Sequence, residues 1–272
     1  MITKVCGIYF SATGNTKKIT ETVTAQLAKN LGCPMELKDF TAPAARAEVK
    51  EFPADTLVVV GSPTYAGKLP NKILPDFQTK LKGNGTPAVA VVTFGNRSFD
   101  NSLAELVSVL TAGGFRPVAG AAFACRHAFS DLLAPGRPNE ADLKAAEAFV
   151  LKAAGRAEEL AETGEVLQVP GDAAAAYYVP KGTDGQPAKF LKAKPLTDMK
   201  KCTKCGYCVT LCPVASIDPK DVANVPGICI KCQACVRGCP VGAKYFDDPA
   251  FLSHVKMLEQ NFTERKENSF FL

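Results

Sequence analysis

The segment VCGIYFSATGNTKKI, Val5 to Ile19, places an apolar run directly before a polar, glycine-containing loop and the start of a helical pattern. The run VCGIYF is apolar at every position, which is typical of a strand buried on both faces of a parallel sheet. Because a loop and then a helix follow this strand, the segment predicts the first crossover unit of an α/β sheet.

The same alternation continues through the first 160 residues, as a parallel sheet with crossover helices requires. Runs such as TLVVVG and AVAVVTF are apolar on both faces, like the first run. We expect strands at Val5–Phe10, Met35–Phe40, Thr56–Gly61, Ala88–Phe94 and Val118–Ala124. Helices are expected near 16–31, 71–80, 102–112 and 140–162.

The loop SATGNT has the composition of a phosphate site. The hydroxyls of Ser11, Thr13 and Thr16, together with the backbone amides at the start of the helix, could surround an anion. The loop lacks the lysine of a Walker A loop and the pattern G-x-G-x-x-G, which disfavours a nucleoside triphosphatase and a dinucleotide fold. The alternative is that Thr-Gly-Asn is only a turn and a helix cap.

A second pattern dominates the last third of the chain. CTKCGYCVTLCP, Cys202 to Pro213, has the spacing C-x2-C-x2-C-x3-C-P, and CIKCQACVRGCP, Cys229 to Pro240, repeats it. Disulfides are disfavoured in a reducing compartment, so eight clustered cysteines point to metal. Zinc is the weaker alternative, since a third cysteine at the same interval exceeds what a tetrahedral site uses. The three remaining cysteines, 6, 33 and 125, are expected to be small buried hydrophobic residues.

Residues 197 to 247 resemble the bacterial two-[4Fe–4S] ferredoxins through these two runs. The resemblance implies two cubane clusters, with the fourth cysteine of each run ligating the other cluster. The expected metal ligands are Cys202, Cys205, Cys208 and Cys239 for one cluster, and Cys229, Cys232, Cys235 and Cys212 for the other.

Residues 3 to 160 resemble the flavodoxins, whose FMN phosphate loop has the form S/T-x-T-G-N-T. The resemblance implies a doubly wound five-stranded parallel sheet of order 2-1-3-4-5, with FMN at the carboxyl ends of its strands. It also implies two further flavin loops, within GSPTYAGKLP after the third strand and FGNRSFDN after the fourth. The expected FMN contacts are Ser11, Ala12, Thr13, Gly14, Asn15, Thr16, Pro63, Thr64, Tyr65, Ala66, Gly67, Phe94, Gly95, Asn96, Arg97, Phe99 and His127.

Several of these residues have an alternative assignment. Tyr65 and Phe99 stand where an aromatic ring would stack on the flavin, but each alone could be a core or surface residue. His127, in the loop after the fifth strand, is either a flavin-edge or proton-transfer residue or an ordinary polar loop residue. Asp100 is expected to cap the following helix, and His254 to be an ordinary surface or packing residue.

The formal net charge of +5 does not make this a basic protein. Two [4Fe–4S]2+ clusters with their thiolates carry −2 each, which lowers +5 to +1, and a flavin phosphate lowers it further. The sequence contains no basic stripe with interleaved aromatic residues, which is the pattern that would indicate nucleic-acid binding. Residues 1–163 hold 18 Lys and Arg against 16 Asp and Glu, whereas flavodoxins are usually acidic. A positive setting should ease formation of anionic reduced flavin.

The chain divides into four expected parts. Residues 1–163 form the FMN-binding domain, 164–196 a Gly- and Pro-rich linker, 197–249 the α+β two-cluster domain, and 250–272 a tail with a short amphipathic helix. The linker is expected to be a plain tether, although Tyr177 and Tyr178 could pack on either domain. Without a signal peptide or a long apolar run, we expect a cytoplasmic protein outside the membrane.

The whole chain resembles the flavodoxin–ferredoxin fusion proteins of anaerobic bacteria and archaea. This resemblance implies an electron carrier that links one- and two-electron traffic for low-potential redox partner proteins. The alternative is an FMN-dependent oxidoreductase of the flavin reductase type, supplied by the clusters; a redox sensor ranks third. No catalytic residue is assigned, and the sequence leaves open the direction of electron flow and whether the chain forms a homodimer.

Overall fold

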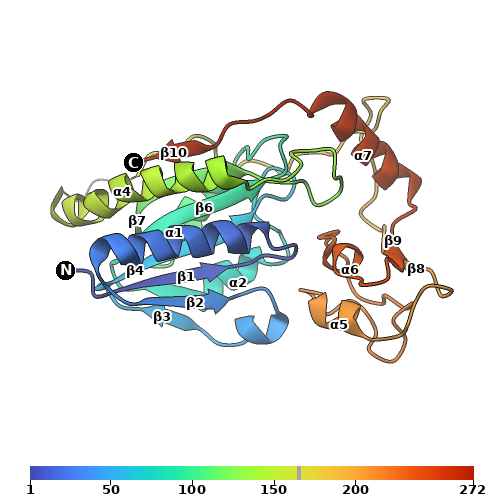
Figure 1. Ribbon diagram of the computed structural model, residues 1–272, viewed down its shortest axis with the longest axis horizontal. Helices are drawn as coiled ribbons and strands as arrows, with labels where there is room; N and C mark the ends of the chain where they lie inside the picture. Colours follow the sequence, from blue (N-terminus) through green and yellow to red (C-terminus); the bar gives the residue numbers. More distant parts are fainter. Residues whose placement is uncertain (164–166) are drawn as a thin grey trace.

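The computed structural model describes residues 1–163 and 167–272, so residues 164–166, where the predicted linker begins, lie outside the described part (Figure 1). The first 163 residues form an α/β unit. Its strands are β1 (Lys4–Tyr9), β2 (Met35–Asp39), β3 (Lys50–Phe52), β4 (Thr56–Pro63), β5 (Leu81–Gly83), β6 (Thr86–Phe94) and β7 (Phe115–Ala124). Its helices are α1 (Asn15–Leu31), α2 (Leu74–Lys80), α3 (Ser102–Ala112) and α4 (Glu140–Thr163), with a 3-10 turn η1 at Pro43–Arg46.

The main sheet has the strand order β10-β7-β6-β4-β1-β2. Its five strands from β2 to β7 are parallel, and β3 and β5 pair separately. Counted along the chain, the five parallel strands have the order 2-1-3-4-5 of the flavodoxin-like doubly wound fold, so the predicted fold class is confirmed. The sixth strand, β10 (Ser269–Phe271), comes from the tail and is antiparallel to β7, which the sequence did not predict.

Helices cover both faces of this sheet. One core contains Ile19, Val23 and Leu27 of α1 and Phe149 and Val150 of α4, packed on one face of the strands. The other core holds Phe77 of α2 and Leu103, Leu106 and Leu110 of α3 on the opposite face. The strands are therefore buried on both sides, which explains their unbroken apolar runs. Helix α2 begins at Leu74 rather than near 71, and Pro75 lies in its first turn, where proline fits.

Residues 167–195 have little regular secondary structure, but they pack along the α/β unit. Leu167 and Val169 join its core. The Tyr177 hydroxyl donates a hydrogen bond to the Leu69 carbonyl at 2.8 Å, and the backbone amide of Tyr178 donates one to Ala66. The expectation of a plain tether is therefore wrong for the described part of this segment.

The cysteine-rich segment folds as two similar halves beside the carboxyl ends of the parallel strands (Figure 1). Its elements are β8 (Leu196–Thr197), α5 (Tyr207–Leu211), α6 (Ala234–Arg237) and β9 (Lys244–Tyr245), with β8 and β9 paired antiparallel. The tail contributes helix α7 (Pro249–Asn261) and then β10. None of the helices in the described part of the chain is long and apolar enough to span a membrane.

Candidate functional site

A cavity lies at the carboxyl edge of the sheet, beside the loop between β1 and α1. This loop cavity is lined by Ser11, Ala12, Thr13, Asn15, Thr16, Pro63, Tyr65, Thr93, Phe94, Gly95, Cys125, Arg126, His127 and Ala128. These residues come from the loops after β1, β4, β6 and β7. A doubly wound sheet binds its ligands at this edge, where the strand order reverses.

The loop between β1 and α1 is held by hydrogen bonds to its neighbours. The residue at the N-cap of α1 is Gly14, with φ of 93°, so the N-cap residue has no side chain with which to cap the helix. The side-chain amide of Asn15 donates a hydrogen bond to the Arg126 carbonyl at 3.0 Å, and the Thr16 and Thr93 hydroxyls form a hydrogen bond at 2.7 Å. The Ser11 hydroxyl accepts from the Lys17 amide at 3.0 Å. These bonds fix the loop at a helix N-terminus, whose partial positive charge suits a phosphate.

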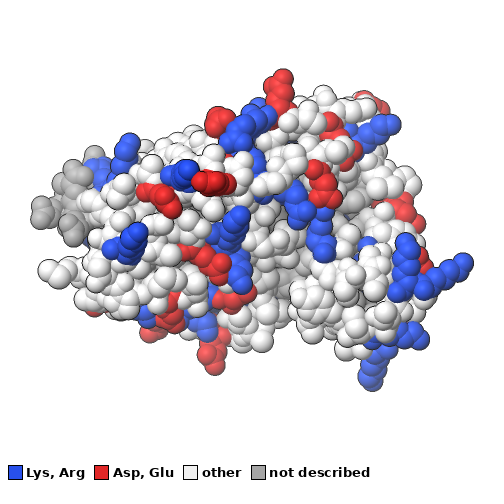
Figure 2. Space-filling model, viewed as in Figure 1, with Lys and Arg blue, Asp and Glu red and all other residues white. Residues whose placement is uncertain are grey.

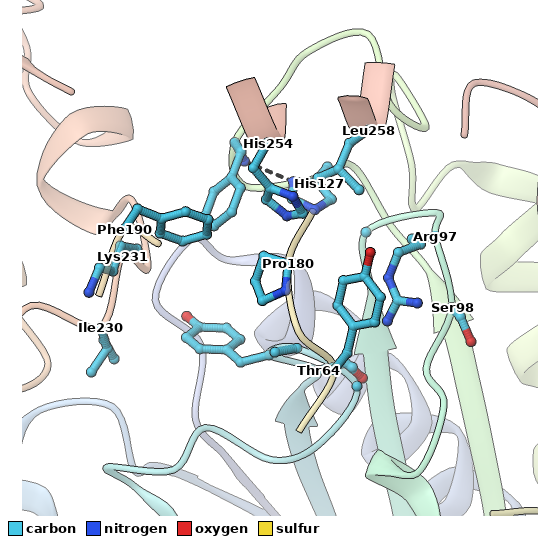
Figure 3. A pocket seen from close by; sticks show the side chains of 16 residues that line it. Thr64, Arg97, Ser98, His127, Pro180, Phe190, Ile230, Lys231, His254 and Leu258 are labelled. Atoms are coloured by element: carbon cyan, nitrogen blue, oxygen red, sulfur yellow. Dashed lines mark hydrogen bonds between the residues drawn. The ribbon is translucent and has the colours of Figure 1, made fainter. Parts of the chain in front are cut away.

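A second, larger cavity adjoins the first, because Tyr65, Gly95 and His127 line both. This interface cavity is enclosed by several parts of the chain (Figure 3). Its remaining lining residues are Thr64, Ala66, Gly67, Arg97, Ser98, Phe129, Tyr178, Pro180, Phe190, Ile230, Lys231, His254 and Leu258. The two cavities together offer a polar end at the β1–α1 loop and a mostly apolar, aromatic-lined end beside it.

Arg97 and Tyr178 both line the interface cavity, and Arg97 can be followed in Figure 3. The Arg97 guanidinium lies 4.0 Å from the centroid of the Tyr178 ring, a cation–π contact. Arg97 also pairs with the carboxylate of Asp100. The expectation that Asp100 caps α3 is wrong, because the N-cap position is Asn101 and no side chain caps this helix.

His127 lies where the two cavities meet. Its Nδ1 accepts a hydrogen bond from the backbone amide of Phe129 at 3.0 Å. Burial, followed by the nearby His254, lowers the pKa of His127 to about 3, so the ring is neutral near pH 7. A neutral imidazole with an accepting Nδ1 carries its proton on Nε2, which can donate to a ligand. The fit is tight: a Cβ at Gly95 would lie 2.2 Å from His127 Cδ2.

His254 of α7 lies over the same cavity (Figure 3). Its Nδ1 lies 2.8 Å from the Lys181 carbonyl and donates to it, since a carbonyl can only accept. The ring stacks on Phe190 at 5.4 Å and is buried. Packing is thus one role of His254, as expected, but the residue also lines a cavity.

Most predicted flavin contacts line one of the two cavities, but three do not. Gly14 forms the left-handed N-cap of α1. The buried Asn96 amide donates to the carbonyls of Phe262 and Glu264 and so anchors the tail. Phe99 packs against the core, with its ring 5.6 Å from that of Phe94.

The sequence did not identify the cavity residues that come from outside the α/β unit. Tyr178, Pro180 and Phe190 belong to the irregular segment, and Leu258 to the tail helix. The aromatic pair Tyr177-Tyr178 within a Gly- and Pro-rich stretch was the one available signal, because exposed loops seldom need two adjacent large rings.

The eight clustered cysteines line two further cavities, four in each. The outer cysteine cavity holds Cys202, Cys205, Cys208 and Cys239. The inner cysteine cavity holds Cys212, Cys229, Cys232 and Cys235. The fourth cysteine of each run therefore lies with the first three of the other run. In the described residues no three His, Cys, Asp or Glu side chains converge as ligands of a single ion, and each group of four instead surrounds a cavity.

The backbone around these cysteines repeats with an offset of 27 residues. Lys204 and Lys231 both adopt positive φ, at 57° and 55°, and their amides donate to the sulfurs of Cys202 and Cys229 at 3.4 Å. The Cys212 and Cys239 sulfurs each accept an amide hydrogen bond at 3.2 Å. Amide donors to sulfur are a known means of holding and tuning iron–sulfur clusters, so these residues fit two cubanes.

The inner cysteine cavity adjoins the interface cavity. Ile230, between two of the cysteines, lines both of them. Tyr65 lies at the same junction: burial, and then the nearby thiols of Cys232 and Cys229, raise the pKa of its hydroxyl well above the usual value of 10. The outer cysteine cavity shares no lining residue with the interface cavity. Of the two cysteine cavities, the inner one therefore lies next to the interface cavity.

Known proteins are similar to each of the two parts of the chain. Residues 201–244 match the family model of the 4Fe-4S dicluster domain. The solved structures that match include a flavodoxin of Streptococcus pneumonia TIGR4, with 19% identity, a TM-score of 0.40, and coverage of 56% of this chain and 99% of that chain. Oxidised flavodoxin 2 from Bacillus cereus matches with 16% identity, a TM-score of 0.39, and coverage of 56% and 99%. No curated protein matches.

The rubredoxin:oxygen oxidoreductase of Desulfovibrio gigas also matches, with 19% identity and a TM-score of 0.37, over 58% of this chain and 37% of that chain. At these scores the fold class rests on the strand order and helix packing of the chain itself. The chain thus joins a flavodoxin-like unit to a 4Fe-4S dicluster segment, a combination with an electron-transfer or redox role.

Proposed function

We propose that this flavodoxin–ferredoxin fusion passes electrons between two [4Fe–4S] clusters and FMN held within one chain, and so links one- and two-electron carriers. Residues 1–163 would hold FMN and residues 197–249 the clusters. The observation that carries the proposal is Ile230, which lines both the interface cavity and the inner cysteine cavity. A shared wall supports transfer within one chain, because the two proposed binding sites would then adjoin each other.

The residues of the loop and interface cavities fit FMN. The loop from Ser11 to Thr16 would bind the phosphate at the N-terminus of α1. The ring would occupy the interface cavity beside Tyr65, with Nε2–H of the neutral His127 as a hydrogen-bond donor. Bound there, FMN supplies a site that can store one or two electrons, whereas each cubane exchanges one.

The order of the sites follows from their exposure. Cys205 of the outer cysteine cavity is exposed, whereas Cys232 and Cys235 of the inner cavity are buried. The outer site is thus open to a partner protein, and the inner site lies between it and the flavin site. Electrons could pass along this order in either direction.

Contacts between the two units support transfer within the chain. The Arg46 guanidinium donates to the Pro213 carbonyl, next to Cys212, at 2.6 Å. Arg237, two residues after Cys235, donates to the Ala128 carbonyl at 3.0 Å and to Asp131 at 2.6 Å. These charge-assisted hydrogen bonds hold the cysteine-rich segment against the loops of the α/β unit.

The proposal is tested by the kinetics of flavin reduction. Reconstituted protein is mixed anaerobically with a limiting one-electron donor, and the flavin and cluster absorbances are followed. Transfer within one chain predicts that electrons leave the clusters for the flavin with a first-order rate that does not change with protein concentration. A rate proportional to concentration would show transfer between chains, and clusters that stay reduced beside oxidised flavin would refute the carrier function.

The flavin site has a test of its own in Gly95→Ala. The added methyl would meet the His127 ring, so we expect FMN affinity to fall about ten-fold or more, measured by quenching of flavin fluorescence. Gly155→Ala is the matched control, because its Cβ meets nothing within 4 Å. Equal affinities of the two variants would place FMN elsewhere.

Flavin reductase activity is the competing outcome. Anaerobic addition of NADPH alone distinguishes the two functions, since a reductase accepts hydride from NADPH and loses its flavin absorbance directly. The carrier should instead stay oxidised with NADPH and be bleached by a reduced low-potential donor. Direct bleaching by NADPH at a catalytically competent rate would replace the carrier proposal.

A further inference from the structure

The end of the molecule that carries the outer cysteine cavity has an exposed apolar surface. Met199, Tyr207 and Val241 are 47%, 50% and 41% exposed. Val241 lines the outer cysteine cavity itself, as does the exposed Cys205. Apolar side chains of this size around a redox site are typical of a surface that another protein covers.

Lysines surround this apolar surface. Lys200, Lys201 and Lys204 are all exposed, and Figure 2 shows Lys and Arg side chains gathered at the end that carries β8, β9 and α5. Asp198 partly offsets their charge, because it accepts a hydrogen bond from the Lys200 backbone amide and its carboxylate lies 3.7 Å from the Lys201 ammonium. The outer rim of this surface is therefore positive.

A lysine also lines the outer cysteine cavity, where the thiolates of a cluster would carry negative charge. Lys244 lines that cavity, is buried, and donates to the Val222 carbonyl. Lys200, Lys201 and Lys204 are exposed to solvent like Cys205, whereas Lys244 is 3% exposed. Because exposed charges are screened beyond roughly 10 Å in 0.1 M salt, the nearest charges govern the encounter.

We propose that the surface formed by Met199, Lys200, Lys201, Lys204, Tyr207 and Val241, the docking face, binds an acidic electron-transfer protein. This inference rests on the proposed carrier function and names the chemistry of the partner. On docking, the partner's redox centre loses one electron and the outer cluster site gains it, or the reverse. No bond changes and no proton moves in this step.

The charge pattern favours an acidic partner over a basic one or a second copy. A basic protein would meet like charges at the rim, which disfavours its approach. A second copy docked face to face would bring the same three lysines together. Opposite charges on a partner would instead accelerate association, most strongly at low salt.

The test measures binding to an acidic plant-type [2Fe–2S] ferredoxin as the probe, immobilised on a biosensor surface. The holoprotein with Lys200→Glu, Lys201→Glu and Lys204→Glu is compared with a control that carries Lys29→Glu, Lys144→Glu and Lys152→Glu. Both variants change the net charge equally, and the control lysines are exposed on α1 and α4. Visible spectra verify that both variants hold their cofactors.

The docking face predicts that its triple variant associates with the probe about ten-fold or more slowly than the natural sequence in about 50 mM salt. The difference should disappear near about 0.5 M salt, and the control should stay within about three-fold of the natural sequence. Equal loss in both variants would mean that only total charge matters, and no loss in either would mean that the surface is not used; both outcomes overturn the inference. Salt-sensitive self-association abolished by the same triple variant would make a second copy the occupant and also overturn it.

Binding is read without electron transfer, so the result is separable from that for the carrier function. A protein that binds the probe through the docking face but whose flavin is never reduced through its clusters would uphold this inference and refute the carrier. A protein that reduces its flavin from the clusters but ignores the docking-face lysines would do the opposite.

Discussion

Lys244 distinguishes the two halves of the cysteine repeat. The residue 27 positions before it is Ile217, which lines the inner cysteine cavity, whereas Lys244 lines the outer one. Lys244 is 3% exposed, and no carboxylate pairs with it among the residues described. Its ammonium opposes the burial that raises the pKa of Cys208 and Cys235. A buried cation without an acidic partner is costly unless an anion lies nearby, and the cysteine thiolates of two clusters would provide it.

Lys244→Met should therefore make the clusters harder to reduce. Removing a buried positive charge disfavours the extra electron, and we expect a shift to lower potential of about 59 mV or more, ten-fold in the one-electron equilibrium. A redox titration followed by electron paramagnetic resonance measures it. Lys192→Met, at an exposed lysine, is the control and should leave the potentials unchanged. An unchanged potential in a Lys244→Met protein that holds both clusters would contradict the prediction.

His127 should make the fold sensitive to acid. Its pKa is about 3 in the native protein, against 6.5 for an unperturbed histidine. Between these values the unfolded chain binds more protons than the native one, so stability is fully present above pH 6.5 and is lost as the pH falls through this window. Each pH unit costs about 1.4 kcal/mol for such a group.

The variant His127→Gln can still accept the hydrogen bond from Phe129 but does not titrate. Between pH 7.5 and 5.5 we expect the natural protein to lose about 1 kcal/mol more of its unfolding free energy than this variant. Urea titrations at the two pH values give the difference. His254 is present in both proteins, so equal losses would show that His127 is not held neutral.

At the scale of elements, the sequence predicted the strands and helices whose positions depend on local residue patterns. The five parallel strands and the helices of the α/β unit lie within a few residues of their expected positions, because each has a strong periodic signal. The grouping of the cysteines follows from their spacing. Strand β10 was missed because Ser-Phe-Phe is too short to show a period, and its strand conformation depends on pairing with β7.

The walls of the interface cavity were missed for a related reason. Tyr178 and Phe190 lie in a segment that glycine and proline keep irregular, so no periodicity shows which unit it packs against. Phe99 differs from the other predicted aromatic contact, Tyr65. Its position after a strand predicts a flavin contact, whereas in the structure its ring packs against Phe94 and the core and lines neither cavity.

Strand β10 should add measurable stability through Phe270. This ring stacks on Phe149 at 5.2 Å and meets Phe123 edge-on at 5.5 Å, and it is 36% exposed. We expect Phe270→Ala to lower the unfolding free energy by about 1–3 kcal/mol, less than for a fully buried ring. Leu272→Ala, two residues later and exposed, should change it by less than about 0.5 kcal/mol. Equal effects in urea titrations would show that β10 does not stay on the sheet.

For the whole molecule, Arg46 and Arg237 connect the two units on different elements. Arg46 is buried and also pairs with Asp76 at 2.6 Å, so it is fixed within the α/β unit while it reaches Pro213. Arg237 lies at the end of α6 and reaches the loop after β7. The hydrogen bond of Arg237 is the first cause that lowers the pKa of the Asp131 carboxyl. The units are thus held by directional bonds in addition to the chain between them.

Loss of these bonds should separate the units without unfolding either. Hydrogen bonds to charged groups contribute about 1.5–3 kcal/mol each, so we expect Arg237→Met to raise the separated fraction about ten-fold or more, and the double variant with Arg46→Met to raise it further. Proteolysis within residues 167–195 should accelerate with the separated fraction, and the first-order reduction of the flavin through the clusters should slow as the docked fraction falls, most clearly in the double variant. Lys80→Met is the control, because Lys80 donates to Ala47 within the α/β unit. An unchanged reduction rate in a double variant that is mostly separated by its proteolysis rate would mean that electrons reach the flavin without the docked arrangement.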